Sequence, residues 1–293
     1  MASSKGSKVS PTIYFSFAAV GLIIAVLGLL FPDFYDSNTG RVGLSLTIPK
    51  SIQKYLLTPS HEDRHQYRAQ VFSRDPLVMY IHDFLTPEEI DYVLKYSEPR
   101  YEPSKVYGGI DNPPITDEKM RRSEQVIMDR KDPIARRLAQ RAREFQGWRG
   151  NTTYVQPLSV QRYNVSGFYN YHFDPDGYIT KGNRVTSFMI YLTDDCTGGG
   201  TNFPFLPQPN DTRWCDVIEC DEEAKDGFQG TTFKPVKGSA VFWENFYPNG
   251  SWHHGVYHAS LPVKSGIKVG LNIWSWDSAW EAPAEEEHVN ATS

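Results

Sequence analysis

The chain has 293 residues with 30 Lys and Arg against 35 Asp and Glu, giving a formal net charge of −5 at pH 7. No broad basic surface is available to neutralise phosphates, which excludes nucleic acid as a main partner, and an aromatic content of 14% argues against a disordered chain. The length accommodates one large domain, for which about 200 residues bury a sufficient core, together with attached segments.

Residues 12–31 form a run without a charged side chain. At a rise of 1.5 Å per residue about 20 residues cross a bilayer core, and the run is longer than the roughly 7–15 apolar residues of a cleaved signal peptide. We therefore expect an uncleaved transmembrane signal anchor over 12–31. Lys5 and Lys8 precede the run whereas Asp33 and Asp36 follow it, so the positive-inside rule predicts a cytosolic tail over 1–11 and a lumenal remainder.

Two further features indicate the endoplasmic reticulum, with the chain as a single-pass type II membrane protein. N-x-S/T sequons for glycosylation occur at Asn151, Asn164, Asn210, Asn249 and Asn290. The cysteines are Cys196, Cys215 and Cys220, which permit one disulfide and one remaining thiol in an oxidising compartment. The loop between the last two is the shortest to close, but the sequence leaves the pairing open.

The segment 32–75 mixes Pro, Ser and charged residues without a sustained period, which predicts a stem that ends where a domain begins at Pro76. Residues 77–84 are typical of a short strand. Thr86-Pro87 provides an N-cap and a first-turn proline for a helix that ends near residue 97. Asp132-Pro133 opens a second helix, whose apolar residues repeat at a period of 3.6.

Beyond Gly147 the helical signals stop and β-rich runs follow at 158–163, 169–173, 185–192, 240–242, 256–258 and 267–276. Helices followed by strands predict an α+β domain over 76–277, with antiparallel strands rolled into a barrel or jelly roll and the helices packed outside. Residues 278–293 are expected to form a frayed acidic tail.

A histidine and an aspartate in one predicted strand carry the first chemical signal. Side chains alternate along a strand, so His172 and Asp174 project to the same face. A third ligand would complete the triad of two histidines and one carboxylate, which leaves open positions on Fe(II) for an organic acid and dioxygen. The H-x-D pattern alone is also compatible with an ordinary His–Asp pair at a strand end.

Downstream, His258 and Lys268 lie on either side of a turn between two predicted strands, ten residues apart. If His258 binds the metal, Lys268 can point into the same cavity and offer a cation to a second carboxylate, since a buried lysine without an anionic partner is costly. His253 and His254 compete for the metal position, but neither has this relation to Lys268.

Over residues 76–277 the sequence resembles the catalytic domain of prolyl 4-hydroxylases, which are Fe(II)- and 2-oxoglutarate-dependent dioxygenases. The resemblance rests on an ordered series: Tyr163, Tyr169, His172, Asp174, Arg184, Thr186, Tyr191-Leu192, Gly199-Gly200-Thr201, Phe203-Pro204, His258 and Lys268. One position departs from the pattern, because Ser260 stands where the family often has glycine, and this puts the local geometry in question.

The resemblance implies a double-stranded β-helix (jelly-roll) core with flanking N-terminal helices. It also implies a reaction that hydroxylates peptidyl proline with dioxygen while 2-oxoglutarate becomes succinate, supported by ascorbate. Carried over by position, the metal ligands would be His172, Asp174 and His258, and the distal carboxylate of 2-oxoglutarate would be held by Lys268, Tyr163 and Thr201.

Tyr169 and Arg184 would be catalytic residues along the path of the peptide, and Trp274 would line the same path or contact the cosubstrate. Two alternatives remain open: an oxygenase of the same fold that acts on another residue or a small molecule, and a membrane glycoprotein that kept the fold without turnover.

Overall fold

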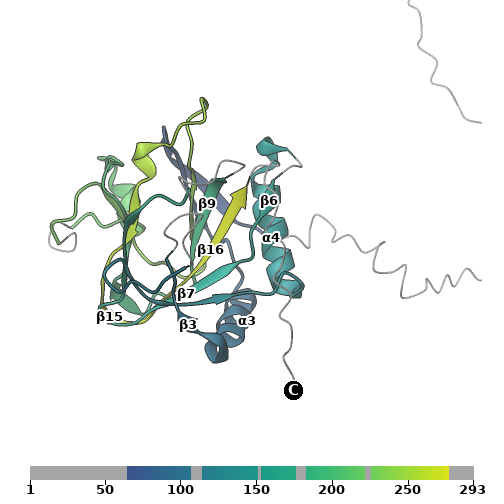
Figure 1. The fold of residues 1–293 in the computed structure, drawn as a ribbon. Helices are drawn as coiled ribbons and strands as arrows, with labels where there is room; N and C mark the ends of the chain where they lie inside the picture. The colour runs from purple at the N-terminus through teal and green to yellow at the C-terminus, as the bar shows by residue number, and fades with distance from the viewer. Residues whose placement is uncertain (1–64, 107–113, 151–152, 176–182, 222–225, 277–293) are drawn as a thin grey trace, which may run out of the picture. The chain divides into compact units, whose positions relative to one another are not determined.

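A computed structural model describes residues 65–106, 114–150, 153–175, 183–221 and 226–276 (Figure 1). The predicted cytosolic tail, the anchor over 12–31, most of the stem and the acidic tail over 278–293 lie outside these residues. Within the described ranges, no helix is long and apolar enough to cross a membrane.

The strands form two antiparallel sheets that face each other. The larger sheet runs in the order β1 (Arg68–Arg74), β2 (Leu77–His82), β13 (Ala240–Glu244), β9 (Arg184–Tyr191), β16 (Lys268–Trp276), β7 (Ser159–Tyr163), β5 (Glu124–Ile127) and β3 (Glu102–Pro103), with β6 (Tyr154–Val155) paired to β16. The smaller sheet runs β12 (Thr231–Phe233), β11 (Thr201–Phe203), β14 (His258–Ser260), β8 (Phe168–His172) and β4 (Arg121–Arg122). A ribbon of β10 (Cys196–Gly198) and β15 (Val263–Gly266) completes the predicted jelly roll.

Two helices, α3 (Pro87–Ser97) and α4 (Pro133–Phe145), lie beside the larger sheet, as predicted (Figure 1). Thr86 caps α3 by accepting from the Glu89 backbone N–H at 3.2 Å, and the Glu89 carboxylate accepts from the Thr86 N–H at 3.1 Å. The same buried carboxylate binds Arg141 of α4 through two hydrogen bonds of 2.6 and 2.8 Å. One side chain therefore begins the first helix and fastens it to the second.

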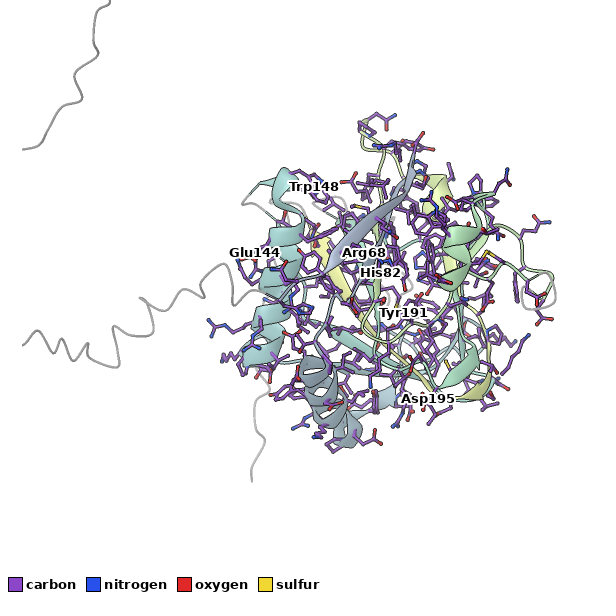
Figure 2. All side chains as sticks on the ribbon, turned by 180° about the vertical axis from the view of Figure 1, so that it is seen from behind. Arg68, His82, Glu144, Trp148, Tyr191 and Asp195 are labelled. Carbon is purple, nitrogen blue, oxygen red and sulfur yellow. A yellow bond between two sulfur atoms is a disulfide. The ribbon has the colours of Figure 1, made fainter. Side chains whose placement is uncertain are left out.

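The hydrophobic core has two parts because the central strand β9 is buried on both faces. Phe188 and Ile190 pack toward the helices, together with Leu138 of α4. Met189 and Tyr191 project the other way, into the space between the sheets, and Tyr191 lies inside the molecule in Figure 2. This second space also holds the polar residues described below.

Strand β1 corrects the predicted stem, because it lies within residues 32–75 and belongs to the domain. Arg68 is the register partner of His82, beside which it lies in Figure 2. Most of β1 is exposed, so it lacks the alternation that would mark a strand. Phe72 anchors the edge strand, with ring centroids 4.8 Å from Trp214 and 4.9 Å from Phe233. The domain therefore begins before Pro76.

Smaller differences concern loops and short elements. Val256 was expected in a strand but ends a 3-10 helix (His254–Val256), and β14 begins only at His258. Further 3-10 helices span Glu98–Arg100, Gly147–Arg149 and Thr212–Asp216. Cys215 and Cys220 form a disulfide, whereas Cys196 is free, which confirms one bridge and one thiol.

Candidate metal and cosubstrate site

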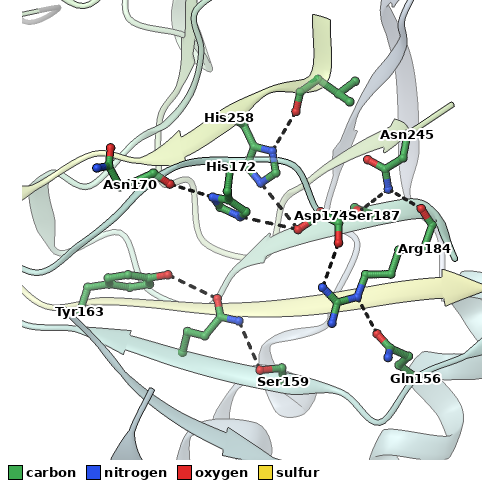
Figure 3. Close-up of polar contacts among 12 residues, drawn as sticks. Gln156, Ser159, Tyr163, Asn170, His172, Asp174, Arg184, Ser187, Asn245 and His258 are labelled. Atoms are coloured by element: carbon green, nitrogen blue, oxygen red, sulfur yellow. Dashed lines mark hydrogen bonds and ion pairs between the residues drawn. The ribbon is translucent and has the colours of Figure 1, made fainter. Parts of the chain in front are cut away.

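Three potential metal ligands converge between the two sheets. His172 ends β8, Asp174 follows two residues later, and His258 begins β14 as the register partner of His172. Nε2 of His172 lies 3.7 Å from Oδ1 of Asp174, and Nε2 of His258 lies 3.9 Å from the same oxygen (Figure 3). The predicted ligand atoms all lie within 4.8 Å of one another, so one ion could contact all three. Two imidazoles and one carboxylate suit Fe(II) and leave coordination positions open.

The orientation of both histidines is fixed by backbone carbonyl groups. Nδ1 of His172 lies 2.8 Å from the Asn170 carbonyl oxygen, and Nδ1 of His258 lies 2.9 Å from that of Val256. A carbonyl oxygen can only accept, so each Nδ1 carries the proton. Each Nε2 then presents a lone pair to the cluster, which is the tautomer that a metal ligand requires.

The Asp174 carboxylate is held from behind by a short hydrogen-bond chain (Figure 3). The Ser187 hydroxyl donates to Oδ2 at 2.5 Å, and the Asn245 amide donates to that hydroxyl at 3.0 Å. The Arg184 guanidinium donates to the Asp174 backbone carbonyl at 3.1 Å. These contacts leave Oδ1 directed at the histidines.

The protonation states at neutral pH suit a cation. Burial opposes ionisation of Asp174, but the neighbouring His258, His172 and Arg184 more than offset it and hold its pKa below its usual range. Burial, with a contribution from His172, lowers the pKa of His258 to about 4. Asp174 is therefore ionised and His258 neutral, and neither needs to lose a proton before binding a metal.

A β-bulge brings Tyr169 into the site. His172 pairs with His258 and Tyr169 pairs with Ser260, so two residues of β8 oppose the single residue Ala259 of β14. Strict alternation would send Tyr169 and His172 to opposite faces, whereas the bulge stacks their rings with centroids 3.7 Å apart. The Tyr169 ring therefore packs against the metal cluster.

Lys268 lies at the far end of the cavity that the two histidines line. Its side chain has no solvent exposure, and Nζ donates to the Ser260 hydroxyl at 2.7 Å. Tyr163 is its register partner, with the ring centroid 5.1 Å from Nζ. Burial lowers the pKa of Lys268 to about 7. A buried cation with a neutral partner fits an anionic guest, which would supply the missing charge.

Thr201 lines the same cavity as Tyr163 and Lys268, so the structure brings together three of the four residues that the sequence assigned to the cosubstrate, without Trp274. The Thr201 hydroxyl accepts from the buried Tyr191 hydroxyl at 2.8 Å. Gly199 keeps the Lys268 stem free of obstruction, because a Cβ built there would lie 3.2 Å from Cδ of that lysine. Gly199 also has φ +68°, a conformation that favours glycine.

Arg184 and Trp274 contact each other next to Asp174, whose backbone carbonyl accepts from Arg184. The guanidinium sits 4.2 Å above the Trp274 ring, and its Nε donates to Gln156 at 3.0 Å (Figure 3). Trp274 is six residues from Lys268 on β16, or about 20 Å along the strand. It is not among the residues that line the cavity with Lys268, Tyr163 and Thr201.

The competing histidines are engaged elsewhere. His253 lies 2.7 Å from an Asp75 carboxylate oxygen and stacks on Tyr247 with ring centroids 3.9 Å apart. His254 is exposed. Neither joins the cluster formed by His172, Asp174 and His258.

Sequence reasoning missed Ser187 and Asn245, which orient Asp174. Ser187 lies on β9 at the middle of a run predicted as an apolar strand, and a serine in such a run carries no distinguishing signal. Asn245 directly follows β13. Their role depends on how β8, β9 and β13 come together, and the sequence alone does not predict that arrangement.

Comparison with known proteins agrees with this geometry. Residues 158–276 match the model of the 2OG-Fe(II) oxygenase superfamily. The chain is 26% identical over 230 residues to the prolyl 4-hydroxylase subunit alpha-1 of Rattus norvegicus, covering 75% of this chain and 37% of the relative. It is 29% identical over 216 residues to subunit alpha-3 of Bos taurus, covering 71% and 35%. The chain thus spans little more than a third of these relatives.

A solved structure has a similar fold. The viral collagen prolyl hydroxylase of Paramecium Bursaria Chlorella virus-1, in its 2-oxoglutarate complex, superposes with a TM-score of 0.50 at 24% identity. The match covers 68% of this chain and 96% of the viral chain.

Proposed function

We propose that this chain, whose residues 158–276 match the model of the 2OG-Fe(II) oxygenase superfamily, is a prolyl 4-hydroxylase-like dioxygenase that hydroxylates proline in a peptide or protein. The observation that carries the proposal is one cavity with two chemically distinct ends. His172 and His258 line one end with their neighbour Asp174, and the buried Lys268 lies at the other.

The two ends match the two functional groups of a 2-oxo diacid. His172, Asp174 and His258 would hold Fe(II), and Lys268, with Tyr163 and Thr201, would receive the distal carboxylate. When bound, Fe(II), 2-oxoglutarate and dioxygen together supply the oxidising power that inserts one oxygen atom into an unactivated C–H bond and leaves succinate and carbon dioxide. Ascorbate would sustain turnover, as in other prolyl hydroxylases.

Aromatic side chains pack around the metal ligands. The Trp243 ring lies 4.8 Å from the His258 ring, the Phe203 ring lies 5.4 Å from it, and the Tyr169 ring stacks on His172. Burial of Lys268 strengthens its interaction with an anion, because little solvent screens the two charges.

The peptide would approach on the side of Arg184 and Trp274. The sequence relatives are prolyl 4-hydroxylase subunits, which supports proline as the residue that is hydroxylated. The Arg184 guanidinium over the Trp274 indole places a cation beside an apolar face, and the indole suits a proline-containing peptide whose ring packs on it.

Sequence features outside the site support a location for the protein. The apolar run over 12–31, the charges that flank it and the sequons support a type II protein of the endoplasmic reticulum membrane with a lumenal domain. The Cys215–Cys220 disulfide suits an oxidising lumen. Asn210 and Asn249 are exposed, as glycosylation requires.

The direct test incubates purified protein with Fe(II), 2-oxoglutarate, ascorbate and a proline-rich peptide, and measures both succinate and the peptide mass. We expect succinate formation that rises with the peptide, and peptide products heavier by one oxygen atom. Succinate with an unmodified peptide would point to another substrate of the same fold. A complete lack of succinate would reject the dioxygenase assignment.

A further inference from the structure

We propose that Ser260 is an additional cosubstrate-binding residue, which holds the Lys268 ammonium and donates its hydroxyl proton to the distal carboxylate of the 2-oxo diacid. The inference rests on the proposed function and deepens it. The sequence resemblance gives Ser260 no role, because the family often has glycine at this position.

The contact between Ser260 and Lys268 is direct. Nζ of Lys268 donates to Oγ of Ser260 at 2.7 Å, and among the described residues this is the one hydrogen bond that the ammonium makes. Both residues line the cavity that also contains His172 and His258. A carboxylate that pairs with Lys268 in this cavity would therefore lie next to Ser260.

The hydrogen-bonding capacity of Ser260 is only partly used. A serine hydroxyl has one proton to donate and two lone pairs that accept. Lys268 occupies a lone pair, and no described residue accepts the Ser260 proton. The proton is therefore available to a guest in the cavity, and a carboxylate oxygen would form a charge-assisted hydrogen bond with it.

Thr201, the cross-strand neighbour of Ser260, has a similar pattern of hydrogen bonds. Thr201 of β11 is the register partner of Ser260 of β14, and its hydroxyl accepts from the buried Tyr191 hydroxyl at 2.8 Å. Thr201 thus also has one lone pair engaged by a buried donor, and no described residue accepts its hydroxyl proton. Directly opposed residues in antiparallel strands have Cβ atoms about 4.5–5.5 Å apart, so two hydroxyls can address the two oxygens of one carboxylate while Lys268 supplies the charge.

Glycine at position 260 would remove both the hydrogen bond to Lys268 and the hydroxyl proton for the carboxylate. The Lys268 ammonium would lose its hydrogen-bond partner within the protein, and unpaired buried charges are costly. Serine keeps Nζ in place before the cosubstrate arrives, so less ordering is required on binding. Two rigid hydroxyls and one fixed ammonium also define the depth at which the distal carboxylate must lie, which selects the length of the diacid.

The test compares a ligand that has the distal carboxylate with one that lacks it. The protein is loaded with Mn(II) in the absence of oxygen, and calorimetry measures the dissociation constants of 2-oxoglutarate and of 2-oxopentanoate, which has the same five-carbon chain with one carboxylate. The variants are Ser260→Ala, Ser260→Thr and Ser265→Ala. Ser265 is a matched control, because it is an exposed residue of β15 whose hydroxyl contacts Thr197.

We expect Ser260→Ala to weaken 2-oxoglutarate binding by about tenfold, as the loss of a hydrogen bond to a charged group implies. Binding of 2-oxopentanoate and of Mn(II) should stay unchanged, Ser260→Thr should retain most of the affinity, and Ser265→Ala should behave as wild type. Unchanged 2-oxoglutarate binding in Ser260→Ala would overturn the inference, as would an equal loss for both ligands. If the wild-type protein binds neither ligand, the proposed function itself fails.

Discussion

His172 and His258 face each other as register partners on two antiparallel strands, and each hydrogen-bonds through Nδ1 to the carbonyl of the residue two positions before it. Their Nε2 atoms lie 3.7 and 3.9 Å from the same oxygen of Asp174. Local backbone therefore orients both rings before any ion is present. A ligand set that is already ordered binds a metal without a large entropic cost.

Removal of the carboxylate should abolish tight metal binding. We expect Asp174→Ala to lose most of its affinity for Fe(II) or Mn(II), because this carboxylate is the anionic member of the cluster. His253→Ala is the control, since His253 contacts Asp75 outside the cluster. Metal titration followed by calorimetry measures both variants. Equal losses in the two would show that the cluster is misassigned.

The hydroxyl behind the carboxylate should matter although it touches no metal. Ser187→Ala leaves Asp174 without its 2.5 Å hydrogen bond, and loss of such an orienting partner typically weakens a metal site by about 10- to 100-fold. Ser275→Ala provides the control, because Ser275 is equally buried but contacts Gln146 at a distance from the cluster. The prediction fails if Ser187→Ala and Ser275→Ala hold the metal equally well.

Affinity for 2-oxoglutarate should depend on pH through Lys268. Burial lowers its pKa to about 7, and a bound carboxylate would favour the ammonium and raise that pKa. Below pH 7 the ammonium is already present, whereas above pH 7 binding must take up a proton. The dissociation constant should therefore be nearly flat below pH 7 and rise by up to about tenfold per pH unit above it.

Lys268→Arg is the control for this pH dependence, because a guanidinium stays charged throughout the range. The Cys196 thiol, whose pKa burial raises, remains neutral over the same window. Calorimetry at pH 6 to 9 should show the rise in wild type and a flat profile in Lys268→Arg. An identical slope in both proteins would assign the titration to another group.

Exposed sequons provide a test of the lumenal location. Asn210 and Asn249 lie on the surface of the domain. When the full chain is made in cells with a secretory pathway, Asn210→Gln and Asn249→Gln should each remove one increment of mass that endoglycosidase treatment also removes. Protein that shows no mobility change with endoglycosidase, and is degraded by protease added to intact microsomes, would contradict the lumenal location.

The sequence predicted the parts of the site that depend on local order. Asp132 and Pro133 mark the start of α4, as observed. His258 and Lys268 were expected on strands around a turn; each does begin a strand, but β15 lies between them. His172 and Asp174 were expected in one strand, whereas β8 ends at His172 and Asp174 follows it. The two side chains still meet, with 3.7 Å between Nε2 and Oδ1, because they are close neighbours in the sequence.

The remainder depends on contacts between distant segments. Alternation along β8 gives the wrong face for Tyr169, since the bulge opposite Ala259 arises only when β8 pairs with β14. Strand β1 is held by its pairing with β2 and by Phe72, not by a period in its own sequence. The contact between Ser260 and Lys268 likewise appears only once β14 and β16 meet at the closed end of the cavity.

The stoichiometry of turnover tests most directly whether the protein hydroxylates proline with 2-oxoglutarate. Wild-type protein is supplied with Fe(II), 2-oxoglutarate, dioxygen, ascorbate and a proline-rich peptide, while succinate is quantified and the peptide is sequenced by mass spectrometry. We expect one succinate for each oxygen atom added, with that oxygen on proline, and no product from Asp174→Ala. The proposed function would be contradicted if proline stayed unmodified and if Asp174→Ala and His253→Ala both behaved as wild type.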